Sequence, residues 1–187
     1  RKGPPIWFDT DESPRRDTSL EKLAQLRPAF QKDGLVTAGN SPGITDGAAA
    51  MVIMSRKKAR ELCLEPMARI TGYDQAAVKP LEIFTAPVFA IRRLLQRTGH
   101  NLSDFDLVEI NEAFAAQILA NGKVLNIDWG KVNVNGGAIA LGHPIGCSGA
   151  RILVTLLYAL RARGLNSGLA ALCLGGGEAI AMSIEME

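Results

Sequence analysis

This chain of 187 residues has almost no excess of charge of one sign, because it contains 21 lysines and arginines and 19 aspartates and glutamates. The formal net charge of +2 is too small for the electrostatic attraction that drives unspecific binding to nucleic acid or to an anionic membrane surface. No apolar run approaches the roughly 20 residues of a membrane span, and no basic-then-apolar signal opens the sequence. We therefore expect a soluble protein that binds neither nucleic acid nor membrane.

Cysteine is also scarce, with only Cys63, Cys147 and Cys173 in the sequence. An odd number without repeated spacing fits neither a disulfide framework nor a paired zinc motif, which favours a reducing compartment. His143 and Cys147 stand four residues apart, as metal ligands on one helix face can, but no second pair follows them. No metal site is expected.

Glycine is abundant instead, with 19 residues that gather between positions 136 and 149 and again at positions 175–177. Such density marks backbone that adopts unusual dihedral angles or approaches a ligand closely, although tight turns between packed elements would produce it as well. The loop at positions 142–149 lacks the Lys-Ser or Lys-Thr of a phosphate-binding loop, and the residues before it do not fit a dinucleotide-binding fingerprint.

The first part of the chain has little regular periodicity. Residues 1–16 are rich in proline and charge, which is typical of a tail or linker, and one short amphipathic stretch follows at positions 19–26. A small apolar run at positions 48–54 then predicts a buried strand, and Ser55 is a suitable N-cap for a helix that ends near Leu62.

From position 67 onward, predicted strands and helices alternate, which indicates a layered α/β domain. Pro87 and Gly99 delimit one predicted helix, and Gly164 ends another that follows the glycine-rich loop. Two apolar segments around the second glycine cluster predict an antiparallel hairpin. The remaining elements are strands at 67–71, 106–110 and 131–134, a helix at 113–119, a turn at Asn121 and Gly122, and the hairpin strands 169–174 and 179–184.

Three polar residues stand at the ends of these elements, where a regular element fixes a side chain and a loop leaves access to it: Asn111, His143 and Cys173. An imidazole before a helix N-terminus is expected to be neutral, so His143 can accept a thiol proton or donate to an oxyanion. Cys173, with the backbone N–H of Gly175 beside it, can remove a proton and stabilise the enolate that results. The alternatives are a helix-entry histidine and a cysteine that packs as a small apolar residue.

At these residues the sequence resembles the thiolase family of acyl-CoA acetyltransferases. Asn-Glu-Ala-Phe-Ala at positions 111–115, Gly-His-Pro-Ile-Gly at 142–146 and Cys-Leu-Gly-Gly-Gly at 173–177 match three of its motifs in the family's order. The similarity extends to Leu-Arg-Pro-Ala-Phe at 26–30 and Asp-Gly-Ala-Ala-Ala at 46–50. It concerns the C-terminal half of the family only, so we expect the chain to be part of a longer protein or to need a second half.

The resemblance implies the five-layered α-β-α-β-α thiolase fold. Residues 1–44 would be the end of a loop domain that covers the substrate, residues 45–66 the last strand and helix of the N-terminal thiolase domain, and residues 67–187 the C-terminal thiolase domain. His143 would activate a nucleophilic cysteine, and Cys173 would be the acid/base for the second acyl-CoA. Asn111 would hold a water that forms one oxyanion hole with His143, and the Gly175 N–H would contribute to another. The pantetheine tunnel would be lined by Phe30, Ser41, Ala113 and Phe114.

None of the three cysteines has the sequence context of the family's acylated cysteine, so the nucleophile is expected outside this chain. The implied activity is reversible Claisen condensation of acyl-CoA thioesters, as in an acetyl-CoA C-acetyltransferase, with coenzyme A thioesters as substrates and no prosthetic group. The alternatives are a degradative 3-ketoacyl-CoA thiolase and a half-thiolase that binds acyl-CoA or a partner without catalysis. The expected partners are an N-terminal thiolase half and further copies of the enzyme in a dimer or tetramer. We expect a cytoplasmic location, with mitochondria and peroxisomes as alternatives.

Overall fold

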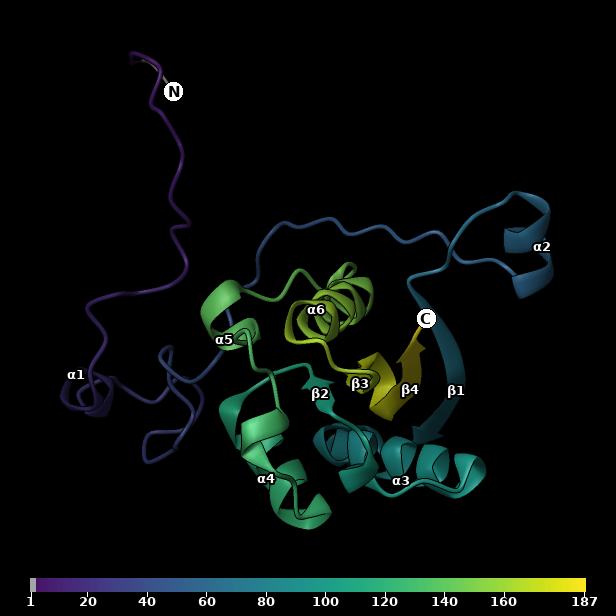
Figure 1. Ribbon diagram of the computed structural model, residues 1–187. Helices are drawn as coiled ribbons and strands as arrows, with labels where there is room; N and C mark the ends of the chain where they lie inside the picture. Colours follow the sequence, from purple (N-terminus) through teal and green to yellow (C-terminus); the bar gives the residue numbers. More distant parts are fainter. Residues whose placement is uncertain (1–2) are drawn as a thin grey trace.

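A four-stranded sheet forms the centre of the computed structural model, which describes residues 3–187 (Figure 1). Its strands are β1 (Ala68–Ala77), β2 (Leu107–Ile110), β3 (Ser167–Leu174) and β4 (Glu178–Met186), in the order β1-β4-β3-β2. β4 pairs antiparallel with β1 and β3, whereas β2 and β3 are parallel. Because Ile110 lies opposite Ala171, β2 and β3 both finish at the same edge of the sheet.

Helices cover both faces of this sheet, as Figure 1 shows. Helix α3 (Ala86–Thr98) packs against β1, β3 and β4 through Ile91 and Leu94, which are both fully buried. Helix α6 (Ser148–Arg163) packs on the other face, where Leu156 and Leu160 are fully buried. The predicted layered α/β architecture is therefore confirmed, with helix, sheet and helix as the three layers of this chain.

Helix ends follow the local signals in the sequence. α3 ends at Gly99 with φ of 75° and α6 at Gly164 with φ of 63°, left-handed conformations that glycine adopts without the Cβ clash of other residues. The Ser55 hydroxyl accepts from the Lys58 N–H and caps α2 (Arg56–Glu61). Ser19 caps α1 (Leu20–Ala24), within the predicted amphipathic stretch, in the same way.

The glycines at 175–177 join β3 and β4 through a short 3-10 turn, which confirms the predicted hairpin. Gly177 has φ of 104°, and a Cβ there would lie 2.5 Å from the carbonyl oxygen of Val78. Other residues would therefore be strained at this position. Further 3-10 turns are at Pro80–Thr85, Leu102–Asp104 and Trp129–Lys131.

The strand predicted at positions 48–54 is wrong, since these residues form no helix or strand. Val52 is 86% exposed and Ile53 67% exposed, so the apolar run that suggested burial is not buried here. A strand needs a neighbouring strand for its backbone hydrogen bonds, and the described residues provide none at this segment.

Two predictions around position 130 are wrong as well. Helix α4 (Ala115–Leu125) continues through Asn121 and Gly122, where a turn was expected. Gly122 packs under the ring of Trp129, a close approach that a side chain would prevent. The predicted strand at 131–134 is reduced to one bridge between Val108 and Val132, because the side chain of Asn133 takes both backbone hydrogen bonds of Ile110.

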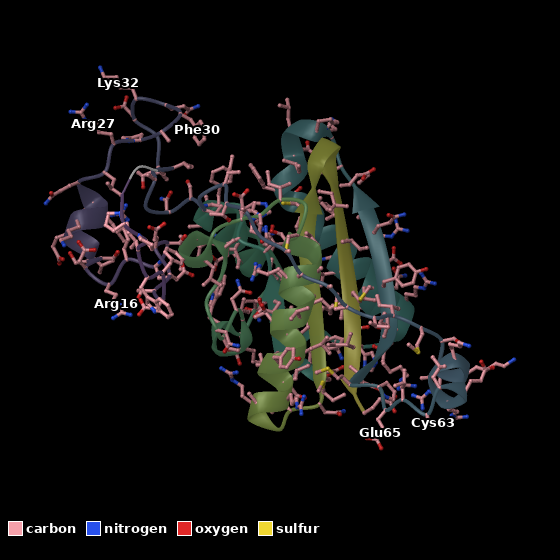
Figure 2. The ribbon with its side chains drawn as sticks, turned by 90° about the horizontal axis from the view of Figure 1, so that it is seen from above. Arg16, Arg27, Phe30, Lys32, Cys63 and Glu65 are labelled. Atoms are coloured by element: carbon pink, nitrogen blue, oxygen red, sulfur yellow. The ribbon has the colours of Figure 1, made fainter. Side chains whose placement is uncertain are left out.

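The part before β1 lies outside the layers (Figure 1). Within residues 3–66, Ala59 is the only buried residue. Figure 2 shows Arg27, Phe30 and Lys32 on a loop at one end of the molecule, and Cys63 and Glu65 beside α2 at the other. Among residues 3–187 no helix is both long and apolar enough to cross a membrane.

Candidate functional site

Asn111 and Cys173 both lie at the edge where the parallel strands end. Asn111 follows β2, and its N–H donates to the Ala171 carbonyl at 3.0 Å, so it continues the pairing by one residue. Cys173 is the second-last residue of β3 and pairs with Ala179. The carboxyl edge of parallel strands is where α/β proteins generally place their ligands. The structure thus brings together two of the residues singled out in the sequence.

The Asn111 side chain is only 1% exposed and has one partner. Its Oδ1 accepts a hydrogen bond from Nη2 of Arg151 at 3.4 Å, whereas its Nδ2 has no partner within residues 3–187. A buried amide donor without a partner is unfavourable unless it binds something, and an ordered water is the usual solution.

His143 lies in the loop between α5 (Ala138–Leu141) and α6, within the predicted glycine-rich loop. Its backbone N–H donates to Gly43 at 2.8 Å, and its Nδ1 lies 2.6 Å from the Ser148 hydroxyl oxygen. That hydroxyl also lies 3.0 Å from the Pro144 carbonyl, and when it donates its single hydrogen there it accepts from Nδ1–H. In this tautomer the lone pair is on Nε2, which is the atom left to act as a base.

The environment of His143 favours the neutral ring. Burial lowers the pKa of His143 below its usual value, and the positive charge of Arg151 lowers it further. A neutral imidazole can accept a proton at neutral pH, which agrees with the expectation from the sequence. Ser148, which is fully buried, was not anticipated, and a serine five residues after a histidine is too weak a signal to reveal it.

Burial raises the pKa of the Cys173 thiol, and a backbone hydrogen bond at the same residue opposes this shift to a smaller extent. The thiol is therefore neutral at rest near pH 7. Gly175 begins the glycine turn two residues further on, close to the Pro80–Thr85 turn.

Glu109 and Arg151 are two further ionisable residues near this edge, and the sequence alone assigned them no role. Glu109 is only 2% exposed, and burial raises its pKa to about 7, against the lowering effect of Arg151. Glu112 raises the same pKa further by repulsion. A glutamate inside the otherwise apolar strand Leu107–Ile110 was the available signal.

Two segments that contact each other contribute the residues expected along a pantetheine tunnel. The ring of Phe114 contacts Phe30 and Phe84 edge to face, at centroid distances of 6.1 and 5.3 Å. The Ala115 N–H donates to the Asn40 carbonyl at 3.0 Å, which ties the segment that contains Ser41 to the start of α4. Ala113 lies between Asn111 and Phe114, so the four expected residues come from two neighbouring segments.

One open hollow of about 340 Å³ lies beside the histidine loop, between residues 45–49 and residues 144–147. Neither His143 nor Cys173 lines it. Across residues 3–187, no three His, Cys, Asp or Glu side chains are grouped so that they could hold a metal ion.

Comparisons with known proteins agree with this architecture and define the class. The family description "Thiolase, C-terminal domain" matches residues 64–186, and "Thiolase, N-terminal domain" matches residues 1–57. The chain belongs to the thiolase family.

Within that family, the chain is similar to enzymes named acetyl-CoA acetyltransferase. It is 54% identical over 185 residues to that of Thiocystis violacea, covering 99% of this chain and 47% of the relative. It is 58% identical over 178 residues to that of Escherichia coli, covering 95% and 45%. The chain thus spans about half the length of these relatives.

Solved structures give the same result. The Bacillus anthracis acetyl-CoA acetyltransferase superposes with a TM-score of 0.93 at 54% identity, over 97% of this chain and 46% of that one. Human mitochondrial 3-ketoacyl-CoA thiolase in complex with CoA superposes with a TM-score of 0.89 at 44% identity, over 96% and 46%. The expected thiolase fold is confirmed.

Proposed function

We propose that this chain supplies the acid/base and oxyanion-hole half of an acyl-CoA acetyltransferase, which condenses two acyl-CoA thioesters reversibly by a ping-pong route. One observation carries the proposal: Ser148 holds His143 in the tautomer with a free Nε2 lone pair, and the ring is kept neutral by burial and by Arg151. The same Arg151 contacts Asn111, which shares its sheet edge with Cys173.

In the first half-reaction, Nε2 of His143 accepts the proton of a cysteine thiol that an N-terminal half provides. The thiolate attacks the thioester carbonyl, and the negative oxygen formed is stabilised by the protonated His143 and by a water on Asn111. Collapse of this intermediate breaks the bond to sulfur of coenzyme A, which leaves with the proton from His143. The product is an acyl-enzyme.

In the second half-reaction, His143, neutral again after the first, accepts the proton of the Cys173 thiol. The Cys173 thiolate then removes an α-proton from a second acyl-CoA, and the Gly175 N–H stabilises the enolate oxygen. The enolate carbon attacks the acyl-enzyme carbonyl, and the nucleophilic cysteine leaves as a thiolate that takes the proton from His143. A thiol whose pKa burial raises is a stronger base once ionised, which suits an α-proton of low acidity. Thiolysis follows these steps in reverse.

Coenzyme A thioesters are the proposed substrates, with no prosthetic group, and Phe30, Ser41, Ala113 and Phe114 are proposed to contact the pantetheine. The division at 1–44, 45–66 and 67–187 is kept as part of this proposal, as are assembly into a dimer or tetramer and a cytoplasmic location. The CoA complex of the 44% identical human relative supports CoA as ligand.

A second candidate is a 3-ketoacyl-CoA thiolase for longer acyl chains, because human mitochondrial 3-ketoacyl-CoA thiolase superposes with a TM-score of 0.88. The two proposed activities use the same residues of this chain. They differ in the length of the acyl group that the site has to accommodate. Comparing thiolysis of acetoacetyl-CoA with that of 3-ketooctanoyl-CoA distinguishes them.

The test is complementation with an N-terminal half from the 58% identical Escherichia coli relative, co-expressed with this chain and called the complemented enzyme below. We expect the chain alone to show no thiolysis of acetoacetyl-CoA, and the complemented enzyme to show it. Turnover by the chain alone would contradict the placement of the nucleophile. A complex that forms on gel filtration, binds CoA and stays inactive would favour the non-catalytic half-thiolase.

A further inference from the structure

Arg151 stands in the first turn of α6, where a positive charge is unfavourable because the N-terminal end of a helix dipole is itself positive. Two of its nitrogens, Nε and Nη1, are buried without a partner within residues 3–187. No Asp or Glu of the described chain lies within ion-pair distance of it. Neither the helix dipole nor an ion pair therefore explains its placement.

The one directional contact of Arg151 is the hydrogen bond from Nη2 to Oδ1 of Asn111. A guanidinium has only donors, so it can face the oxygen of an amide and never the nitrogen. The contact thus decides which end of the Asn111 amide is turned toward α6. The other end, Nδ2, is left as a buried donor without a partner.

Arg151 also connects the groups that lie around the edge of the sheet. Its charge acts on His143 in the loop before α6 and on Glu109 in β2, and Glu112 acts on Glu109 from the end of the same strand. Arg151 is therefore placed to influence both proposed members of one oxyanion hole, Asn111 and His143.

We propose that Arg151 is a positioning residue that orients the Asn111 amide so that its Nδ2 hydrogens bind the oxyanion-hole water. This inference rests on the proposed function for its consequence in catalysis, but not for the contact itself. The contact and the charge of Arg151 can be tested in this chain without turnover.

The first test uses NMR on the full chain with Arg151→Met, which removes the charge and donors and keeps an unbranched side chain. His143 and His100 are the only histidines, so His100 serves as an internal reference. We expect the pKa of His143 to rise and the Asn111 side-chain amide signals to lose their protection from exchange. Arg161→Met, an exposed arginine later in α6, is the matched control and should change neither.

The second test measures kinetics of the complemented enzyme. Arg151→Met should lower kcat about 10- to 100-fold, the range for a misplaced catalytic group, with KM nearly unchanged. In an Asn111→Ala background, Arg151→Met should lower kcat less than about 2-fold further, because the Asn111 amide that Arg151 orients is already absent. Asn111→Asp keeps an acceptor for Arg151 but has no donor, and should lose as much activity as Asn111→Ala.

Thermal unfolding distinguishes this role from a packing role. At pH 5, where Glu109 is protonated, the melting temperature of Arg151→Met should equal or exceed that of the wild type, since a charge that the helix dipole disfavours is removed. A lower melting temperature with equal activity losses in both Asn111 backgrounds would overturn the proposal. Unchanged His143 titration and unchanged Asn111 amide protection in Arg151→Met and Arg151→Lys would overturn it too, whether or not the complemented enzyme is active.

Discussion

Residues 3–66 and residues 67–187 both contain apolar runs, but only the second region buries them. Val52 in the first region is 86% exposed, whereas Leu156 in the second is fully buried between α6 and the sheet. The second region makes its own core on both faces of β1-β4-β3-β2. The first region contributes two short helices and extended backbone, and its contacts with the second region include loops around the proposed site, the packing of Met51 against the core beside α6, and an ion pair of Arg56 with Glu187.

The difference fits the proposal that this chain supplies one half of a catalytic site. Asn111, His143 and Cys173 are fixed by the layered region, through strand pairing and the Ser148 hydrogen bond. From the first region, the Gly43 carbonyl bonds to the His143 N–H, the Asn40 carbonyl bonds to the Ala115 N–H, and the Phe30 ring contacts Phe114. In the proposed function, the nucleophile comes from an N-terminal half, which the first region would join.

The largest expected effect is in the layered region. In the complemented enzyme, His143→Ala should slow acylation by about 10² to 10⁴, the usual range for loss of a general base. Rapid-quench measurement of the acyl-enzyme checks this. His100→Ala is the control, because His100 is exposed and lies just after the C-terminal end of α3. Acylation at the wild-type rate in His143→Ala would make His143 structural.

Truncating an apolar side chain should lower the free energy of unfolding much more in the second region than in the first. Leu156→Ala should lower the free energy of unfolding by about 2–5 kcal/mol, because it leaves a cavity between α6 and β3. Val52→Ala in the chain alone should change it by less than about 0.5 kcal/mol, since the side chain is exposed. Urea unfolding measures both, and equal effects would contradict the division into a packed and an unpacked region.

Glu109 should make the layered region less stable as pH rises. Its pKa is raised by burial from 4.5 to about 7, so the folded state binds a proton that the unfolded state releases between these values. Stability is therefore full below pH 4.5, falls between pH 4.5 and about 7, and is constant above that, with a loss of roughly 3 kcal/mol at most. Glu109→Gln, measured by urea unfolding at pH 5 and pH 8, should remove this fall. A persisting fall would assign it to another group.

The smallest expected effect lies in the first region. Ser55→Ala removes the cap of α2 and should cost about 1 kcal/mol of local helix stability. Hydrogen exchange should show faster opening at the Ala59 amide, which bonds to Ser55, and no change at Leu169 in β3. If exchange at Leu169 accelerated equally, α2 would be part of the cooperative core.

Local signals in the sequence predicted the ends of helices correctly, because these depend on residues that are close together in the sequence. Gly99 and Gly164 end helices because only their own φ angles matter, and Ser55 caps a helix through a residue three positions away. The strand at 48–54 failed because pairing depends on a partner that the described chain does not provide. The turn at Asn121 failed because Gly122 is needed for contact with Trp129 rather than for a turn.

The candidate site divides in the same way. Asn111 and Cys173 could be found because polar residues at strand ends are visible along the sequence, and parallel pairing of β2 and β3 brings them together. Ser148, Glu109 and Arg151 could not be assigned, because their roles come from contacts across loops, strand and helix. One side of β2 carries Leu107, Glu109 and Asn111. That these side chains face Arg151 can be inferred only when α6 is known to cover that side.

The measurement that tests the account most directly is Cys173→Ser in the complemented enzyme, because it separates the two half-reactions. Serine keeps the size and hydrogen bonding of the thiol but ionises far less readily, so it is a poor base for an α-proton. Labelling of the nucleophilic cysteine by acetyl-CoA should persist, while exchange of acetyl-CoA α-protons with deuterated solvent, followed by NMR, should collapse. Normal exchange with intact labelling would show that another group is the base. Loss of labelling together with exchange would place the acylated cysteine in this chain and contradict the account.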